Sequence, residues 1–212
     1  MSAKKWIEIV DSGEITKKQV VEAFQVALKE NSAELAYKLA LLPPDMTNRK
    51  VAEKIVLKAK NPYVCYEFAR DIPGANVKAH EKICLESDDY NSMIEFASDV
   101  PNANTKAFET IILSLHNGDY SYRFLTSVTG ASVSQHQKVI TDSRDEKLIR
   151  LFGSLDIKGV NPKEISAALA RCARSRKSRE NKKVKVVTQN YNPQKLSVKS
   201  DENEDLMLSQ KK

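Results

Sequence analysis

The chain has 212 residues, of which 41% are apolar, and a formal net charge of +6 at pH 7. No run of 18 apolar residues occurs, which argues against a membrane-spanning helix, and the N-terminal residues lack the apolar core of a secretory signal. Three cysteines without a paired spacing fit reduced thiols. We therefore expect a cytoplasmic protein, or a nuclear one in a eukaryote, with no membrane contact.

The positive charge is concentrated near the C-terminus. Residues 1–170 hold 22 Lys and Arg against 23 Asp and Glu, a net of −1, whereas residues 171–212 hold 12 against 5, a net of +7. The average charge therefore hides two regions of different character.

The first predicted elements are two helices, over residues 4–10 and 16–29, whose apolar residues fall on one face. Residues 34–60 form another helix pair. Residues 65–77, CYEFARDIPGANV, then recur as residues 93–105 and 121–133, so that matching positions lie 28 residues apart. A fixed period of this size indicates a repeat array.

Each repeat is predicted to contain two helices. In the first full copy, Asn61 and Pro62 open a helix, Pro73 and Gly74 end it, and Asn76 opens the next. The Asn that recurs at these starts is interpreted as a helix cap.

Residues 145–155 are a degenerate first helix, and a final helix opens at residues 161–164. The sequence therefore predicts an all-α protein, a right-handed α-solenoid of about five antiparallel helix pairs with a disordered basic C-terminal tail. The expected parts are a repeat domain over residues 1–170, a basic helical extension over 171–187 and a disordered tail over 188–212.

The paired short helices resemble HEAT and armadillo α-solenoids, although the 28-residue repeat is shorter than theirs. The motif F-A-x-D-[IV]-P-x-A-N, at residues 68–76 and 96–104, is also similar to repeats of uncharacterised phage and bacterial proteins. The resemblance covers about residues 5–170. It implies a fold and carries no catalytic residues.

Catalytic signals are weak. His80 and His136 lie two repeat periods apart, and Phe108 stands at the equivalent position of the repeat between them. A position that accepts either His or Phe favours a packing role. Asp71 and Asp99 also repeat, and a local turn role is the simpler interpretation. Since no catalytic or metal-binding motif is found, we expect no enzyme activity, cofactor, metal or small-molecule substrate.

Charged columns are the first candidate binding surface. Lysines and glutamates recur one period apart, at Lys50, Lys78 and Lys106 and at Glu53, Glu81 and Glu109. A mixed stripe of this kind suits a protein partner. Ordinary solvated helix surface is the alternative, and the sequence does not decide between them.

The C-terminal arm is the second candidate. Eight basic residues lie within residues 171–185, against the single acid Glu180. These are Arg171, Arg174, Arg176, Lys177, Arg179, Lys182, Lys183 and Lys185. Such density is typical of RNA or DNA binding. An import signal, contact with anionic membranes and solubility remain alternatives. Further on, Leu206-Met207-Leu208 follows an acidic run and forms a candidate docking peptide.

The predicted function is a non-enzymatic helical-repeat adaptor. Its repeat face would dock a protein, and its basic arm would contact nucleic acid or a nucleoprotein complex. The alternatives are a solenoid that cradles RNA or DNA directly, and an enzyme on a helical-repeat scaffold such as a base-excision glycosylase.

Overall fold

The computed structural model describes residues 1–190, and every regular element in that range is a helix. The helices are α1 (Ala3–Asp11), α2 (Lys17–Glu30), α3 (Ala33–Leu41), α4 (Arg49–Ala59), α5 (Pro62–Asp71), α6 (Val77–Leu85), α7 (Tyr90–Asp99), α8 (Thr105–Ser114), α9 (Gly118–Ser127), α10 (Val133–Asp142), α11 (Glu146–Gly153) and α12 (Pro162–Asn190). The all-α prediction is confirmed for this range.

Polar side chains at the helix starts explain where the helices begin. At most of the starts, α1 and α10 excepted, a short oxygen-bearing side chain accepts a hydrogen bond from a first-turn backbone N–H, which would otherwise have no partner. The residues that do so are Thr16, Ser32, Asn48, Asn61, Asn76, Asp89, Asn104, Asn117 and Asp145. The recurrent asparagines are therefore caps, as predicted.

The ends of the first helices also follow the sequence. Helix α5 ends at Asp71, and Gly74 then adopts a φ of +81°, a conformation that favours glycine because it has no side chain. The backbone turns there and Asn76 opens α6. A short loop thus joins the two helices of a repeat.

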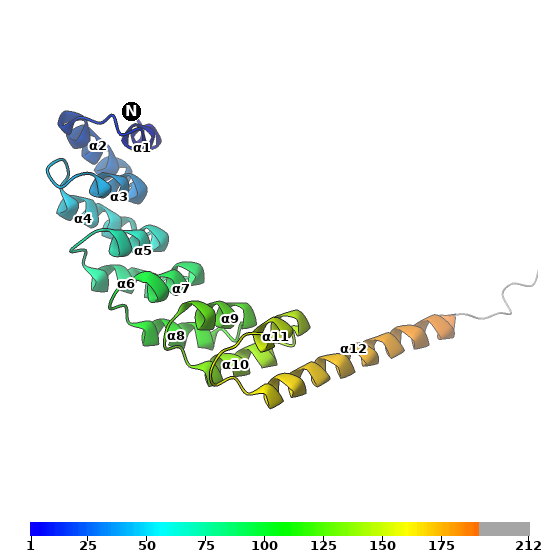
Figure 1. Ribbon diagram of the computed structural model, residues 1–212. Coiled ribbons are helices and arrows are strands. Elements are labelled where there is room, and N and C mark those ends of the chain that lie inside the picture. Colours follow the sequence, from blue (N-terminus) through cyan, green and yellow to red (C-terminus); the bar gives the residue numbers. More distant parts are fainter. Residues whose placement is uncertain (191–212) are drawn as a thin grey trace, which may run out of the picture. The chain divides into compact units, whose positions relative to one another are not determined.

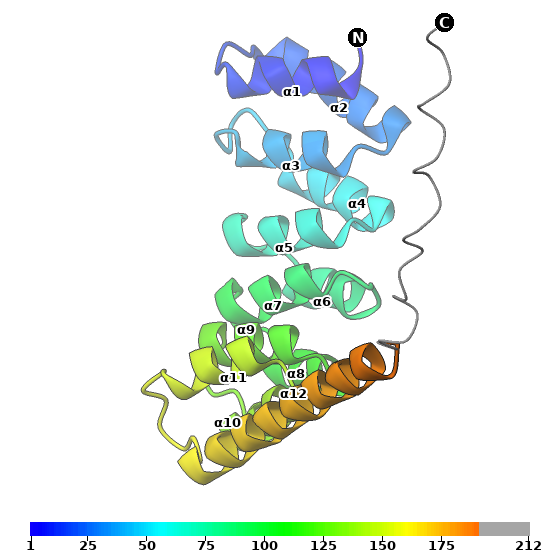
Figure 2. The same ribbon diagram turned by 90° about the vertical axis from the view of Figure 1, so that its right-hand side faces the viewer.

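Helices two apart along the chain pack against one another. Contacts join α3 to α5, α5 to α7 and α7 to α9, and likewise α2 to α4 and α4 to α6. From α2 to α8 the even-numbered helices line one side of the molecule and the odd-numbered ones the other (Figure 1). Figure 2, turned by a quarter, shows the successive layers from α1 to α9.

The core lies between these layers and follows the repeat. Its largest side chains that are at most 1% exposed are aromatic, namely Phe68, Phe96, Phe108, Phe124 and Phe152. Three of them are the phenylalanines that recur every 28 residues in the first helices. The right-handed sense of the array and the number of pairs remain predictions.

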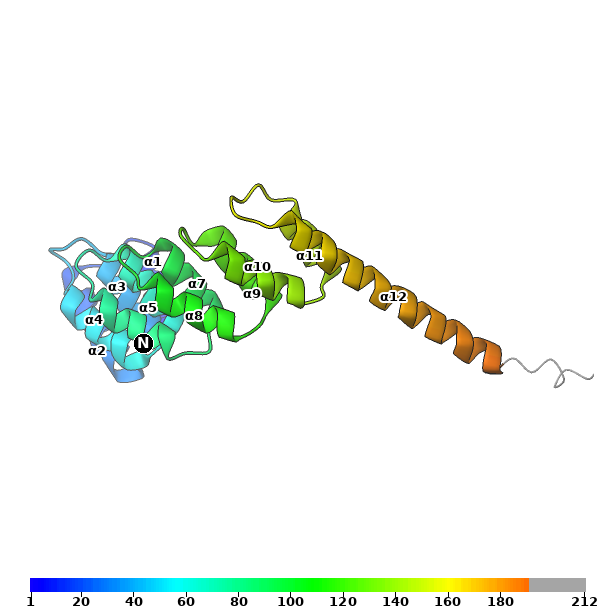
Figure 3. The same ribbon diagram turned by 90° about the horizontal axis from the view of Figure 1, so that it is seen from below.

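The chain divides into two compact units, residues 1–169 and residues 170–212, so that the boundary falls inside α12. Figure 3 shows α12 as one continuous helix. It ends at Asn190, three residues beyond the predicted end of the basic extension. The rest of the predicted disordered tail, with Leu206-Met207-Leu208, lies outside the described residues.

No described helix is both long and apolar enough to cross a bilayer.

Candidate functional site

The glutamate column binds backbone in the next repeat. An oxygen of Glu53 accepts the backbone N–H of Asn76 at 2.6 Å, and Glu81 accepts that of Asn104 at 2.7 Å. Each acceptor lies on a second helix, and each donor is the N-cap of the following second helix. A carboxylate is stabilised there because the N-terminal end of a helix carries partial positive charge. These bonds hold successive repeats in register.

Glu109 makes the most buried bond of this kind. Its carboxylate accepts the backbone N–H of Ser132 at 2.5 Å and receives Nζ of Lys106 at 2.7 Å, while the residue is only 4% exposed. Burial raises the pKa of Glu109, but the hydrogen bonds from Lys106 and Ser132 outweigh it and hold the pKa below its usual value.

The same kind of bond forms at the last junction of the array, where an amide replaces the acid. Gln137 stands 28 residues after Glu109, and its Oε1 accepts the backbone N–H of Asn161 at 2.8 Å. Its Nε2 donates to Glu164 at 2.7 Å. An amide oxygen therefore serves at this position as well as a carboxylate oxygen, and a negative charge is not essential to the bond.

These contacts remove the glutamates from the charged surface that the sequence predicts as a binding site. The side chains of Glu53, Glu81 and Glu109 point into the junctions between repeats, a role that the sequence analysis did not foresee. The structure places the lysines of the column, Lys50 and Lys78 among them, on the exposed surface. The surface therefore presents more positive charge than the sequence suggests. Its role as a protein-docking site remains a prediction.

The two histidines lie in the core. Rings pair within each repeat, Phe68 with His80 at 5.1 Å and Phe124 with His136 at 5.3 Å between centroids. Both histidines are fully buried, and this burial lowers the pKa of each below its ordinary value although a glutamate opposes it. In the repeat between them, Phe108 packs on Phe96 at 5.5 Å. The packing interpretation is confirmed.

The two periodic aspartates bind tyrosines of the preceding repeat, and the expected local turn role was wrong. The Tyr37 hydroxyl donates to Asp71 at 2.6 Å, and that of Tyr66 donates to Asp99 at 2.7 Å. Arg70 joins the two bonds, because it contacts both Asp71 and the Tyr66 hydroxyl. The arginine holds the pKa of Asp71 below its usual value. In the sequence these Tyr–Asp pairs are visible only as a tyrosine that stands 33 or 34 residues before each aspartate.

Two of the cysteines are structural. Cys65 and Cys84 are fully buried, and burial raises the pKa of Cys65 to about 12. The Cys84 thiol donates to the carbonyl of Pro62 at 3.3 Å. Thiols held protonated in this way are poor nucleophiles. Among residues 1–190, no cluster of three or more potential metal ligands occurs.

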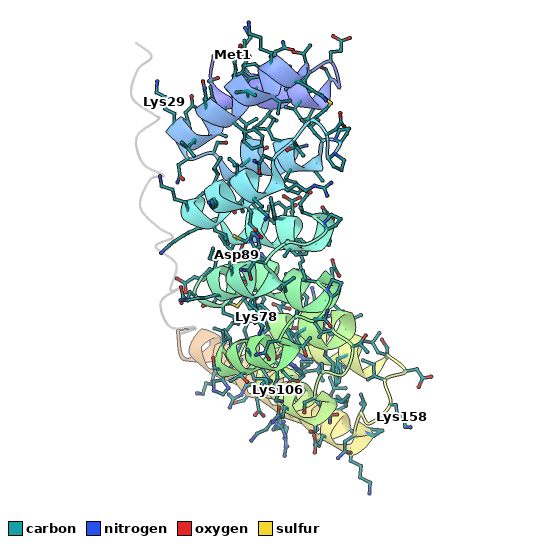
Figure 4. All side chains as sticks on the ribbon, turned by 90° about the vertical axis from the view of Figure 1, so that its left-hand side faces the viewer. Met1, Lys29, Lys78, Asp89, Lys106 and Lys158 are labelled. Carbon is teal, nitrogen blue, oxygen red and sulfur yellow. The ribbon has the colours of Figure 1, made fainter. Side chains whose placement is uncertain are left out.

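The two sides of the repeat array differ in charge. Helices α2, α4, α6, α8 and α10 carry eleven basic and six acidic residues, a net of +5. Helices α1, α3, α5, α7, α9 and α11 carry seven basic and nine acidic residues, a net of −2. Figure 4 looks onto the even-numbered side, where Lys29, Lys78 and Lys106 project outward. The near-zero charge of the body is thus the sum of two unlike faces.

The basic arm forms the second half of α12. Its basic residues up to Lys182 are all exposed, namely Arg171, Arg174, Arg176, Lys177, Arg179 and Lys182. Lys183 and Lys185 also lie within the helix bounds, but their side chains are outside the description. Basic residues at successive positions of a helix point in several directions around its axis. The arm therefore presents positive charge on more than one side.

Comparison with family models, with curated proteins and with solved structures finds no match. The resemblance to HEAT and armadillo repeats remains a prediction.

Proposed function

We propose that this chain is a non-enzymatic helical-repeat scaffold that contacts nucleic acid through its basic arm and a protein through its repeat surface. In this proposal the repeats stack as a right-handed α-solenoid of about five pairs. The body supplies a rigid surface, and the arm supplies affinity for phosphate. The arm, which belongs to a separate compact unit, supports this division of labour.

The observation that carries the proposal is the exposure of the basic arm. From Arg171 to Lys182 six basic residues stand against one acid, and these exposed side chains extend along about three turns of helix. Lys and Arg that neutralise phosphates release condensed counterions, and this release drives non-specific binding. Arg also forms bidentate hydrogen bonds with phosphate oxygens.

The exposed lysines of the even-numbered helices support the protein-docking part. Glu53 and Glu81 are engaged by backbone, so Lys50, Lys54 and Lys78 dominate the accessible charge there. An acidic partner complements such a face. The same +5 side also favours the second candidate, in which the repeats themselves contact RNA or DNA.

Fluorescence anisotropy with labelled RNA and DNA tests the role of the arm. The variant is R174Q/K177Q/R179Q in the full chain. At 0.1 M salt, the loss of three phosphate contacts should weaken binding by about a hundredfold or more. The matched control is K4Q/K5Q/K147Q, which removes three exposed charges from α1 and α11 and should bind as the parent does. Equal affinities for the two variants would contradict the proposal.

A further inference from the structure

Exposed aliphatic side chains gather at one junction of the repeat array. Among the described side chains, seven large apolar ones are exposed, and three of them belong to the neighbouring helices α2 and α4. Val21 and Leu28 on α2 are 59% and 58% exposed, and Val51 on α4 is 36% exposed. Single exposed aliphatic residues are ordinary on a protein surface, whereas several that adjoin one another mark an interaction surface.

Val21 occupies the position of the glutamates that join later repeats. It is the fifth residue after its N-cap Thr16, as Glu53 is the fifth after Asn48. Glu53 accepts the backbone N–H of Asn76, the N-cap of the next second helix, so the equivalent Val21 faces the start of α4. A valine accepts no hydrogen bond, and no oxygen within residues 1–190 accepts the backbone N–H of Asn48. The junction between α2 and α4 therefore lacks the bond that later junctions have.

The other exposed residues line the same junction. Leu28 stands seven residues after Val21, about two helical turns, and so shares its face of α2. On α4, Glu53 marks the flank toward α6, and Val51 lies about 200° around the helix from it. Val51 therefore lies on the flank toward α2, and Lys58, seven residues later, shares that flank. The two flanks face each other because α2 packs against α4 (Figure 1).

Positive charge surrounds these aliphatic side chains. Lys54 and Lys58 are exposed on α4, and Lys18 is exposed about one turn before Val21 on α2. Among residues 1–190, none of these three lysines has a carboxylate within ion-pair distance. Together α2 and α4 carry seven basic and three acidic residues, a net of +4. The α2–α4 patch is defined by Val21, Leu28, Val51, Lys54 and Lys58.

The patch defines the chemistry of its partner. Covering the aliphatic side chains gains free energy, and carboxylates beside them would pair with the lysines. A carboxylate can also bind the N–H of Asn48, as the glutamate does in later repeats. A nucleic-acid backbone supplies negative charge but no aliphatic surface. An amphipathic helix with acids beside its apolar stripe supplies both, and its residues at i and i+7 match the spacing of about 10 Å between Val21 and Leu28.

We propose that the α2–α4 patch binds an amphipathic helix of a partner protein, with glutamates or aspartates on both sides of its apolar stripe. The stripe covers Val21, Leu28 and Val51, and the acids pair with Lys54 and Lys58. This inference rests on the protein-docking part of the proposed function and narrows it to one junction and one partner chemistry. It is independent of the basic arm.

Fluorescence anisotropy of the full chain with three labelled synthetic helices tests the inference. The first probe is a helix of 15 residues with leucines at spacings of three and four and glutamates on both flanks. The second probe has glutamine for every glutamate, and the third has alanine for every leucine. The full chain should bind the first probe, and it should bind each of the others about tenfold more weakly or less, because each lacks one of the two contributions.

Three variants locate the binding site. V21E restores the glutamate of the later repeats, and its carboxylate should accept the N–H of Asn48, so it should melt no lower than the parent. It should bind the first probe at least about tenfold more weakly, because an acid then lies beneath the apolar stripe. L28S should weaken binding about tenfold without adding charge. The control L151E, which adds an acid at a 49% exposed leucine on α11, should bind as the parent does.

The opposite results would overturn the inference. It fails if the full chain does not bind the first probe, or if V21E binds it as tightly as the parent. A lower melting midpoint for V21E would show that Val21 does not face Asn48, which also contradicts it. Self-association of the parent that V21E abolishes would assign the patch to a second copy, and weaker oligonucleotide binding by V21E would assign it to nucleic acid.

A further variant separates this inference from the proposed function. K78Q/K82Q removes two exposed lysines from α6, outside the α2–α4 patch, and should leave binding of the first probe unchanged. If K78Q/K82Q weakens that binding and V21E does not, the protein docks elsewhere on the lysine surface. The inference then fails, while the protein-docking part of the proposed function stands.

Discussion

The repeat body and the basic arm use charged residues in opposite ways. In the body, acids such as Glu53, Glu109 and Asp71 accept hydrogen bonds from the neighbouring repeat and tie the layers together. In the arm, Arg174 and Lys177 are exposed on a helix. The number of charges in a segment therefore says little about its surface until the partners of those charges are known.

The two sides of the repeat body also differ in net charge. The even-numbered helices carry a net of +5 and the odd-numbered ones a net of −2. A segment that is neutral on average can therefore still have a basic face. The following experiments test the contrast between a body held together by internal contacts and an arm whose charge is exposed.

The largest effect is expected from F96A. Phe96 is fully buried and packs on Phe108, so removing its ring should lower the free energy of unfolding by about 3–5 kcal/mol. Neighbouring repeats should unfold with it, since each depends on the contact with the next. Thermal melting followed by circular dichroism measures the loss. The control L151A removes a half-exposed side chain and should change the midpoint little, and an unchanged midpoint for F96A would contradict this packing.

Much of this core could be predicted from the sequence because periodicity reports packing. Phe68, Phe96 and Phe124 recur at the repeat period, and all three are at most 1% exposed. The caps were equally visible, because Asn76 and Asn104 precede apolar stripes at a fixed spacing. These features depend on residues close together in the chain, where the rules of helix starts and faces apply directly.

The second prediction concerns the bond between repeats at Glu109. In E109A the partly buried N–H of Ser132 loses its acceptor, which should cost about 1.5–3 kcal/mol of unfolding free energy. The matched control is E109Q, which keeps an acceptor oxygen, as Gln137 does naturally in the next repeat. Urea unfolding of both variants measures the difference. If E109Q is destabilised as much as E109A, the charge matters more than the hydrogen bond.

These bonds could not be predicted because they join residues in different repeats. The sequence shows that Glu81 recurs, but not whether its carboxylate points to solvent or to the backbone of Asn104, 23 residues ahead. The same holds for Tyr66 and Asp99, which lie 33 residues apart. Charged residues that recur at the repeat period give the same sequence pattern whether they bind a partner or the next repeat.

The third prediction is a pH dependence of stability. Burial lowers the pKa of His80 and His136 in the folded chain, whereas the unfolded value is about 6.5. The unfolded state therefore binds more protons below that pH, and stability should fall as the pH drops from about 6.5 toward 5, by up to about 1.4 kcal/mol per pH unit for each histidine.

Replacing both histidines by phenylalanine, the residue that stands at the equivalent position 108, should flatten the pH dependence of stability. Glu53 faces His80, while Glu109 and Lys106 face His136, and all three charges remain in H80F/H136F. Urea unfolding at pH 5, 6 and 7 compares the variant with the parent. A parent whose stability does not fall over this range, or a variant that falls as steeply, would contradict buried neutral histidines.

Binding of nucleic acid through the basic arm is tested by the salt dependence of the affinity. The arm holds eight basic residues, so binding through it alone should give a log–log slope no steeper than about −7 on duplex DNA, and R174Q/K177Q/R179Q should make the slope shallower by about 3. Anisotropy titrations of the full chain at several salt concentrations give both slopes. An unchanged slope in the variant would contradict binding through the arm, and so would the absence of any binding to RNA or DNA.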